Sequence, residues 1–235
     1  IGHFPERLRR QRQIHLVRFA DDFVVFGRSK ELLETDIKPR IESFLANRGL
    51  TLSPEKTKVV DIEEGFDFLG QNVRKYKGKL LITPAKKSVK ALLHKVRTIL
   101  KTHQHLSAGQ LIAKLNPIIR GWANYHRHVV SKKTFVHIEY QVFQALWRWA
   151  KRRHHNKSNH WIYTKYFRPN HKRSSGFYGV LKGNDGSTHP QRLVKVDKIP
   201  IKRHVKVKAE ANPFVPAWER YFERRLDAKM AAEWQ

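Results

Sequence analysis

Residues 14–26, IHLVRFADDFVVF, consist of two apolar runs separated by Ala20, Asp21 and Asp22. Such a pattern predicts a strand, a tight turn and a second strand. Two adjacent carboxylates at the tip of a hairpin repel each other unless a cation neutralises them, and Mg²⁺ suits oxygen ligands that meet phosphate. Asp21 and Asp22 are therefore candidate catalytic and metal-binding residues. The alternative is a solvated turn, because Asp is a common turn residue.

Further elements follow from periodicity and from turn residues. Ser29 is positioned to cap a helix that Pro39 splits and Gly49 ends. Short strands are expected at 50–52, 59–62, 66–69 and 80–82. Helices are expected at 85–102, 107–126, 133–153 and 158–167, then β-like runs at 177–181 and 192–196, and a final helix at 215–234.

These elements predict an α+β chain of three parts. Residues 1–83 combine hairpins with a helix, residues 84–167 are helical, and residues 168–235 form a small mixed region. No repeat of solenoid period is present.

The charge of the chain points to a polyanionic partner. The 235 residues include 48 Lys and Arg against 20 Asp and Glu, a net charge of +28. Residues 1–70 are neutral overall, residues 71–167 carry +20 with Glu139 as their single acid, and residues 168–235 carry +8. Phosphates would neutralise such a field and release condensed counterions. A membrane surface is a weaker candidate, since aromatic residues interleave with the basic ones and no run of about 18 apolar residues occurs.

The remaining composition bears on compartment and completeness. There is no cysteine, which excludes disulfides and thiolate metal sites and suits a reducing compartment, either bacterial cytoplasm or an organelle. No signal peptide is visible, and the first residue is Ile1, so the chain is expected to be a fragment, a processed product or the C-terminal part of something larger. Histidine pairs at 103 and 105, 126 and 128, and 154 and 155 lack zinc-motif spacing, which favours solvated or phosphate-facing rings.

Several motifs in order carry a specific resemblance. VRFADDFVVF (17–26) is similar to the YxDD hairpin of reverse transcriptases, and GLTLSPEKTKV (49–59) and GFDFLG (65–70) resemble the palm blocks that follow it in group II intron reverse transcriptases. LNPIIRGWANYHR (115–127) and RWAKRRHHNKSNHWIYTKYF (148–167) resemble the maturase thumb of that family.

The resemblance implies a fold and a function. Residues 1–83 would be the end of a reverse-transcriptase palm, 84–167 the thumb or maturase (X) domain, and 168–235 a DNA-binding and linker region before an HNH endonuclease that these residues do not contain. The family copies RNA into DNA with Mg²⁺, binds group II intron RNA, and assists splicing and retrohoming. Its partners would be the intron RNA, an RNA template, a DNA primer or target, and deoxynucleotides.

The resemblance also assigns residues. Asp21 and Asp22 match the metal-binding pair, while the family's third carboxylate comes from an upstream strand that these residues do not include. Phe19 stands where the family usually has Tyr. Primer or template contacts are expected at Phe19, Lys56, Phe68, Leu69 and Gly70, although Lys56 is equally well explained as a surface lysine. RNA contacts are expected at Lys86, Lys87, Lys90, Arg120, Asn124, Arg127, Arg152 and Arg153.

Two other readings stay open at this point. One is a noncatalytic RNA-binding splicing factor with a structural palm remnant. The other is a related reverse transcriptase recruited to another role, such as defence. Trp122, which shares a helical face with Tyr125, is expected to pack mainly in the core.

Overall fold

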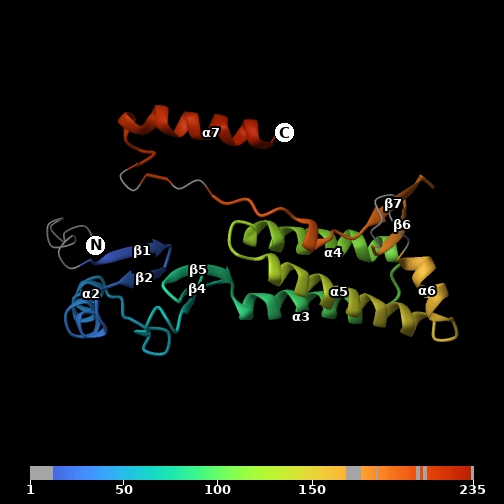
Figure 1. The fold of residues 1–235 in the computed structure, drawn as a ribbon, viewed down its shortest axis with the longest axis horizontal. Helices are drawn as coiled ribbons and strands as arrows, with labels where there is room; N and C mark the ends of the chain where they lie inside the picture. The colour runs from blue at the N-terminus through green and yellow to red at the C-terminus, as the bar shows by residue number, and fades with distance from the viewer. Residues whose placement is uncertain (1–12, 168–175, 184, 205–206, 209–210, 234–235) are drawn as a thin grey trace. The chain divides into compact units, whose positions relative to one another are not determined.

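The computed structural model describes residues 13–167, 176–183, 185–204, 207–208 and 211–233, with side chains as far as residue 226. Chain contacts divide it into two compact units, Ile1–Ile201 and Lys202–Gln235. The described part is a mixed α/β structure with three small antiparallel sheets (Figure 1).

The predicted N-terminal hairpin is confirmed. Strands β1 (His15–Phe19) and β2 (Asp22–Phe26) are antiparallel, and Phe19 pairs with Asp22 across the turn. The two turn residues are therefore Ala20 and Asp21. Ala20 has a φ of 50°, the left-handed backbone that a two-residue hairpin turn requires at its first central position.

The helix after the hairpin is split as Pro39 predicted. A π-helical segment, η1 (Leu32–Ile37), changes into α2 (Lys38–Ala46), with Pro39 in the first turn of α2. Proline has no N–H to donate, so the ladder is interrupted at this point. Ser29 Oγ accepts a hydrogen bond from the Leu32 N–H at 3.3 Å, and Gly49, with a φ of 69°, ends the helix.

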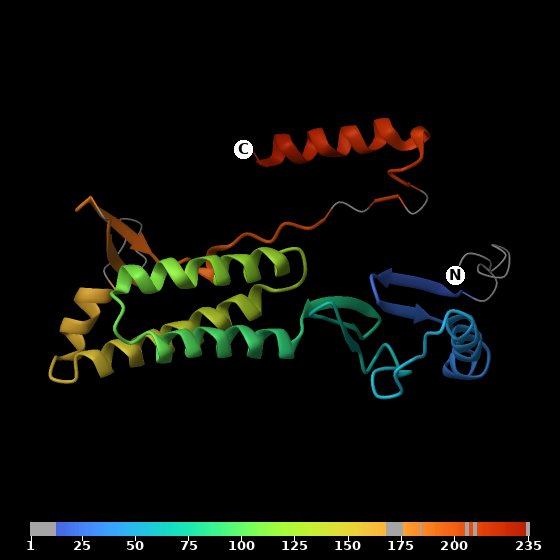
Figure 2. The same cartoon turned by 180° about the vertical axis from the view of Figure 1, so that it is seen from behind.

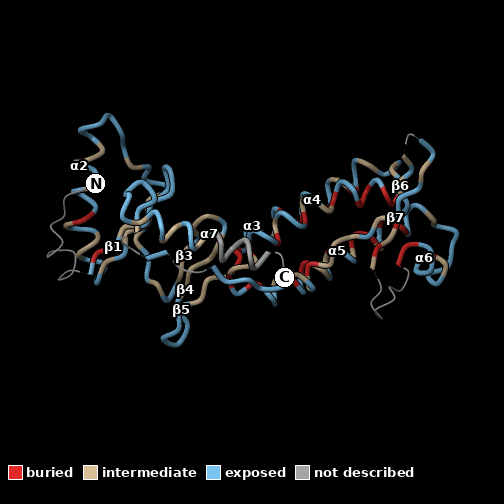
Figure 3. The backbone as a smooth tube through the Cα atoms, turned by 90° about the horizontal axis from the view of Figure 1, so that it is seen from above, coloured by how far each residue is buried: buried red, intermediate tan, exposed pale blue. Residues whose placement is uncertain are grey.

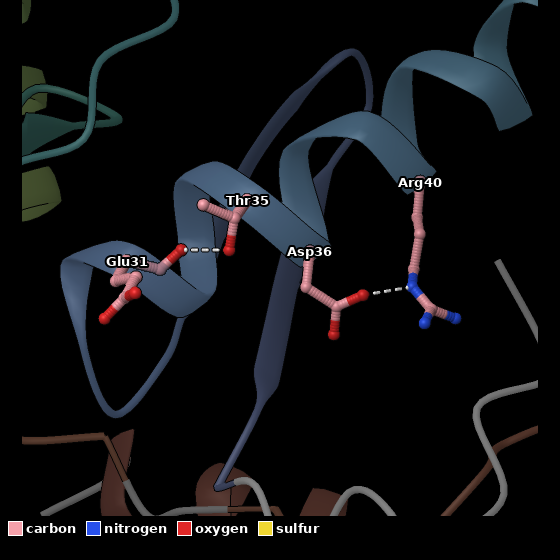
Figure 4. A network of polar contacts seen from close by, with 4 residues as sticks. All are labelled: Glu31, Thr35, Asp36 and Arg40. Atoms are coloured by element: carbon pink, nitrogen blue, oxygen red, sulfur yellow. Dashed lines mark hydrogen bonds and ion pairs between the residues drawn. The ribbon is translucent and has the colours of Figure 1, made fainter.

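Side chains support the irregular turn of this helix (Figure 4). Thr35 Oγ1 donates to the Glu31 carbonyl at 2.8 Å, and Arg40 Nε donates to Asp36 Oδ1 at 2.5 Å. The second pair spans the change from π to α geometry. Both contacts are local to one helix, so they stabilise the break and make no link to another element.

A three-stranded meander follows. It comprises β3 (Phe66–Phe68), β4 (Gln71–Tyr76) and β5 (Lys79–Pro84) in that order. Its two turns, Leu69–Gly70 and Lys77–Gly78, have positive φ at both positions, which matches tight hairpin turns.

Two expected strands in this region were wrong. Residues 50–52 and 59–62 are irregular, and β4 was not expected at all. Short apolar triplets do not form strands without a partner edge, whereas β4 (QNVRKY) is held by a neighbour on each side despite its polar sequence.

Four helices form the largest core, and their predicted bounds are confirmed within about two residues. They are α3 (Lys86–Thr102), α4 (Ala108–His126), α5 (Lys132–Arg153) and α6 (Asn159–Tyr166). Figures 1 and 2 show α3, α4 and α5 side by side. Buried residues concentrate along them (Figure 3), including Leu111, Ile112, Leu115, Phe135, Ile138 and Leu146. Ser107 forms a reciprocal capping box with Gln110 at the start of α4.

A small hairpin packs on the start of α4. Strands β6 (Tyr178–Lys182) and β7 (Thr188–Arg192) pair with each other. The strand expected at 192–196 was therefore wrong, because the partner of β6 lies earlier in the chain. Val196 instead begins the short helix η2 (Val196–Lys198). Phe177 and Val196 belong to the core cluster of α3–α6. Residues 177–199 therefore pack with the helical part, and the boundary expected at residue 168 stays a prediction.

The second unit contains a one-turn helix η3 (Pro216–Trp218) that leads into α7 (Glu219–Glu233). Pro216 lies in its first turn, where a missing N–H is tolerated. In the described part of the chain, no helix is both long and apolar enough to span a bilayer.

Candidate metal-binding hairpin and nucleic-acid interface

The structure places both hairpin carboxylates at the turn between β1 and β2. Asp21 is the second turn residue, and Asp22 opens β2 opposite Phe19, so the side chains of Asp22 and Phe19 share one face. Arg18 Nε donates to the Ala20 carbonyl at 2.8 Å and braces the turn. Phe19 is 62% exposed, and both carboxylates are exposed.

The donor set of this turn fits Mg²⁺ as a partial site. Neither Asp21 nor Asp22 makes a hydrogen bond or ion pair with another described residue, so their oxygens are available. Mg²⁺ is commonly held by one or two carboxylates, with waters and phosphate oxygens completing its shell. Among the described residues, no group of three His, Asp or Glu side chains converges on one point. The hairpin therefore offers two carboxylates and no third protein ligand.

The predicted primer-contact turn is attached to the helical core. Tyr125 of α4 donates its hydroxyl to the Leu69 carbonyl at 2.7 Å, and the Ala85 N–H donates to the Gly70 carbonyl at 3.0 Å. Both carbonyls of the turn are thus held by residues that begin or end the helices α3 and α4. Sequence reasoning grouped Tyr125 with Trp122 and missed its contact with the turn, because no local pattern links residues 56 positions apart.

A buried polar chain lies beneath the same turn. Trp122 Nε1 donates to Ser88 Oγ at 3.0 Å, and Ser88 Oγ lies 3.2 Å from His126 Nε2. Trp122 is half-buried against the core, as expected. A second histidine, His128, lies 3.0 Å from Gln71 Nε2.

His126 is buried in a way that disfavours its charged form. Its side chain is 1% exposed, and burial together with the nearby His128 lowers its pKa from 6.5 to about 4. Its Nδ1 has no hydrogen-bond partner within the described residues. The ring is therefore neutral at pH 7, and the chain Trp122–Ser88–His126 ties α3 to α4 without a charge.

Cations gather at the start of α3. Lys86, Lys87 and Lys90 are all exposed, and the first turn of α3 holds no acidic residue. The helix N-terminus carries partial positive charge, so Lys86 and Lys87 in the first turn are each unfavourable by about 0.3–1 kcal/mol at low salt. A phosphate bound there would be attracted both to the lysines and to the helix N-terminus.

A polar face on α4 carries three more predicted contacts. Arg120, Asn124 and Arg127 follow one another at spacings of four and three residues, which places them on one side of the helix. Arg120 and Asn124 are exposed and Arg127 is half-buried. None of the three makes a hydrogen bond or ion pair with a described residue. Their donors are therefore available to a ligand.

Arg152 and Arg153 lie apart from these residues. They end α5, whereas the Leu69–Gly70 turn adjoins the beginning of α3 and the end of α4. Arg153 Nη1 donates to the carbonyls of Gln104 and Leu106 at 2.7 and 2.9 Å, so this arginine connects α5 to the loop before α4. It also lines a cavity of about 380 Å³ with Lys165.

The remaining two predicted contact residues are Lys56 and Phe68. Lys56 is exposed in a turn closed by its own N–H and that of Thr57 on the Ser53 carbonyl. Phe68 is half-buried at the end of β3. No described contact joins Lys56 to the Leu69–Gly70 turn.

Comparisons with known proteins agree with this arrangement. Residues 1–73 match the reverse transcriptase (RNA-dependent DNA polymerase) family, and residues 89–167 match the group II intron maturase-specific domain. An uncharacterized 91 kDa protein in the cob intron of Schizosaccharomyces pombe is 28% identical over 152 residues, which covers 54% of this chain and 19% of that protein. The chain thus spans about a fifth of the length of this relative.

Along the chain, a match to the reverse transcriptase family is thus followed by a match to the maturase-specific domain. Their order supports the resemblance to an intron-encoded reverse transcriptase and maturase that the ordered motifs predicted.

Proposed function

We propose that this chain supplies the C-terminal end of the polymerase site and an intron-RNA-binding domain in an RNA-directed DNA polymerase that assists group II intron splicing and mobility. Residues 1–83 would be the end of the palm, and residues 84–167, with the α3–α6 bundle, the thumb. The observation that carries the proposal is the pair of free carboxylates at a hairpin turn, followed by a cation-rich helical bundle.

In the proposed reaction, Asp21 and Asp22 would hold Mg²⁺ beside the primer end and the incoming deoxynucleotide. When bound, the metal stabilises negative charge on the transferred phosphate. Arg18 keeps the turn in shape through the Ala20 carbonyl, and Phe19 presents an exposed ring on the same face as Asp22. Without a tyrosine hydroxyl, this ring donates no hydrogen bond. A further carboxylate from the preceding part of the palm would complete the ligand set.

The Leu69–Gly70 turn is proposed to position the primer strand. Gly70 is exposed, has a φ of 73°, and would meet only side-chain atoms of Ser88 and His126, at 3.8–4.0 Å, if it carried a Cβ. Its neighbours therefore leave room for the strand to approach the backbone. Tyr125 fixes the Leu69 carbonyl, so the position of the turn depends on α4.

Intron RNA is proposed to bind along the cationic bundle. Residues 71–167 carry a net charge of +20, and their single acid is turned away from solvent: Glu139 Oε2 accepts the Val196 N–H at 2.9 Å, and burial raises its pKa. Lys86, Lys90, Arg120 and Arg127 are the contacts that this proposal depends on most. Contacts with phosphate would position the RNA, and unpaired bases would provide specificity.

The test compares two variants of the protein that contains this chain and the preceding palm. Arg120→Gln combined with Arg127→Gln should reduce intron-RNA affinity and splicing, since two phosphate contacts are lost. Asp21→Asn combined with Asp22→Asn should leave both unchanged and abolish primer extension. Unaltered splicing in the arginine variant would contradict the RNA-binding assignment.

A further inference from the structure

Helix α5 exposes a line of large apolar side chains that no described element covers. Val136, Tyr140, Phe143 and Trp147 follow at spacings of four, three and four residues, so they lie on one face. Val136 is 54% exposed, Tyr140 58% and Phe143 38%, while Trp147 is half-buried. We call these four residues the aromatic face. The core-facing side of α5, with Phe135, Ile138 and Val142, is separate and buried.

At one end of this face, aromatic rings pack against one another. Phe143 and Trp147 stack with centroids 6.1 Å apart and planes at 22°, and both rest on the buried Phe167, at 5.1 and 5.6 Å. Tyr163 of α6, which is 40% exposed, stacks on the same Phe167 at 6.2 Å and 15°. Phe167 therefore holds exposed rings from two helices in fixed orientations.

Tyr140 continues the line and has no ring neighbour. It lies seven residues before Trp147, a rise of about 10 Å along the helix. Within the described residues, no aromatic ring or hydrogen-bond partner contacts Tyr140, and the residue is 58% exposed. A solvated ring without a ring neighbour matches a base-stacking platform.

The charged residues beside the aromatic face indicate which kind of ligand it can bind. On the adjoining side of α5 lie Lys133, His137, Arg148 and Lys151, all exposed. The carboxylate of Glu139 is engaged with Val196, so no acid borders the face among the described residues of α5. Open aromatic rings beside a row of cations are complementary to single-stranded nucleic acid, whose bases stack while its phosphates meet the cations.

We infer that the aromatic face of α5 binds unpaired nucleotides of RNA, with Tyr140 stacking directly on a base and Lys133 and Lys151 meeting phosphates further along the strand on either side of it. The inference rests on the proposed RNA-binding function of the bundle and adds a site to it. This site is separate from the lysines at the start of α3 and from the polar face of α4.

The experiment measures binding of this chain to two probes by fluorescence anisotropy: a 12-nucleotide single-stranded oligoadenylate and a blunt RNA duplex of about the same length. Tyr140→Phe keeps the ring, whereas Tyr140→Leu keeps an apolar side chain and removes the ring. Since Tyr140 is 58% exposed, neither substitution should unfold the bundle. Equal thermal midpoints for the two variants check this.

Tyr140→Leu should weaken single-strand binding by about fivefold to a hundredfold, the range measured for loss of one base–aromatic stack. Tyr140→Phe should stay within about twofold of the unsubstituted chain, and duplex binding should change little in either variant, because its bases are already stacked.

Three outcomes overturn the inference. Full single-strand affinity in Tyr140→Leu would indicate an apolar contact or a protein partner for this face. An equal loss for both probes would indicate a general effect on the bundle. Absence of salt-dependent RNA binding by the unsubstituted chain would overturn the proposed function along with the inference. The first two outcomes would overturn the inference alone, so failure of the inference can be distinguished from failure of the proposed function.

Discussion

Two glycines of one helix should respond in opposite directions to the same substitution. Gly109 lies in the first turn of α4, where a Cβ would meet the Val180 carbonyl oxygen at 2.3 Å and its carbon at 2.4 Å. Gly121 lies in the same helix, and a Cβ there would meet nothing within 4 Å. The contact at Gly109 is with backbone of β6, so no flexible side chain can move aside.

The magnitudes follow from this difference. Replacing a helical glycine by alanine favours the helix by about 0.5–1 kcal/mol. At Gly121 that gain stands alone and should raise the thermal midpoint by about 1–4 °C. At Gly109 the overpacking of α4 against β6 costs about 1–3 kcal/mol or more, exceeds the gain, and should lower the midpoint.

The assay is thermal or urea unfolding of the chain and of Gly109→Ala and Gly121→Ala, followed by far-ultraviolet circular dichroism. Gly179→Ala provides a second check, because its Cβ would meet the Gly109 nitrogen at 2.3 Å from the other side of the contact. Equal stabilisation by Gly109→Ala and Gly121→Ala would refute the close packing of β6 on α4.

Three further predictions concern pH, a hydrogen bond and salt. The pKa of His126 is about 4 in the folded chain and about 6.5 when unfolded, so between pH 6.5 and 4 the unfolded state binds more protons than the folded state, and the free energy of unfolding should drop by about 3 kcal/mol over that window. His126→Gln should therefore flatten the fall of the thermal midpoint with pH. An unchanged dependence of the midpoint on pH would be inconsistent with a neutral buried ring. Tyr125→Phe removes the hydrogen bond to the Leu69 carbonyl and should destabilise the chain by about 0.5–1.5 kcal/mol in urea titrations, with Tyr140→Phe as the silent control. RNA affinity should fall at least about a hundredfold between roughly 50 and 200 mM salt, as expected for several phosphate contacts, and a flat salt dependence in filter binding would argue against them.

The helical part of the fold could be predicted from the sequence because its local signals agree with one another. Apolar residues recur at helical spacing in α3, α4 and α5, and Ser107 and Ser158 cap α4 and α6 where the expected helices begin. The Asp21–Asp22 hairpin was readable for a similar reason, since two β-branched and aromatic runs flank a two-residue turn.

The strands of the meander and of the C-terminal hairpin were harder to predict, because they form through pairing with neighbouring strands. β4 is polar and forms a strand through its neighbours β3 and β5. Residues 59–62 (VVDI) include three β-branched apolar residues but form no ladder with a strand, although the Ile62 carbonyl accepts the Lys75 N–H of β4 at 2.9 Å. β7 contains Pro190, which the sequence marks as unsuited to a strand, yet as an edge strand it needs fewer N–H donors.

Long-range contacts of the site could not be predicted. The hydrogen bond of Tyr125 to Leu69 and the chain from Trp122 through Ser88 to His126 join residues tens of positions apart. The sequence identified Leu69 and Gly70 from their motif, but only the structure shows that α4 holds their turn. The open ring of Tyr140 likewise follows from burial and not from its position in the sequence.

We propose that Asp21 and Asp22 bind the catalytic metal, and a primer-extension assay tests this claim. The protein that contains this chain with its preceding palm segment is assayed on an RNA template with a DNA primer and Mg²⁺, as wild type and as Asp21→Asn combined with Asp22→Asn. The variant should lose extension by at least about a thousandfold, since about 4 kcal/mol of charge stabilisation is removed, while intron-RNA binding persists. Undiminished extension by the variant would contradict the claim.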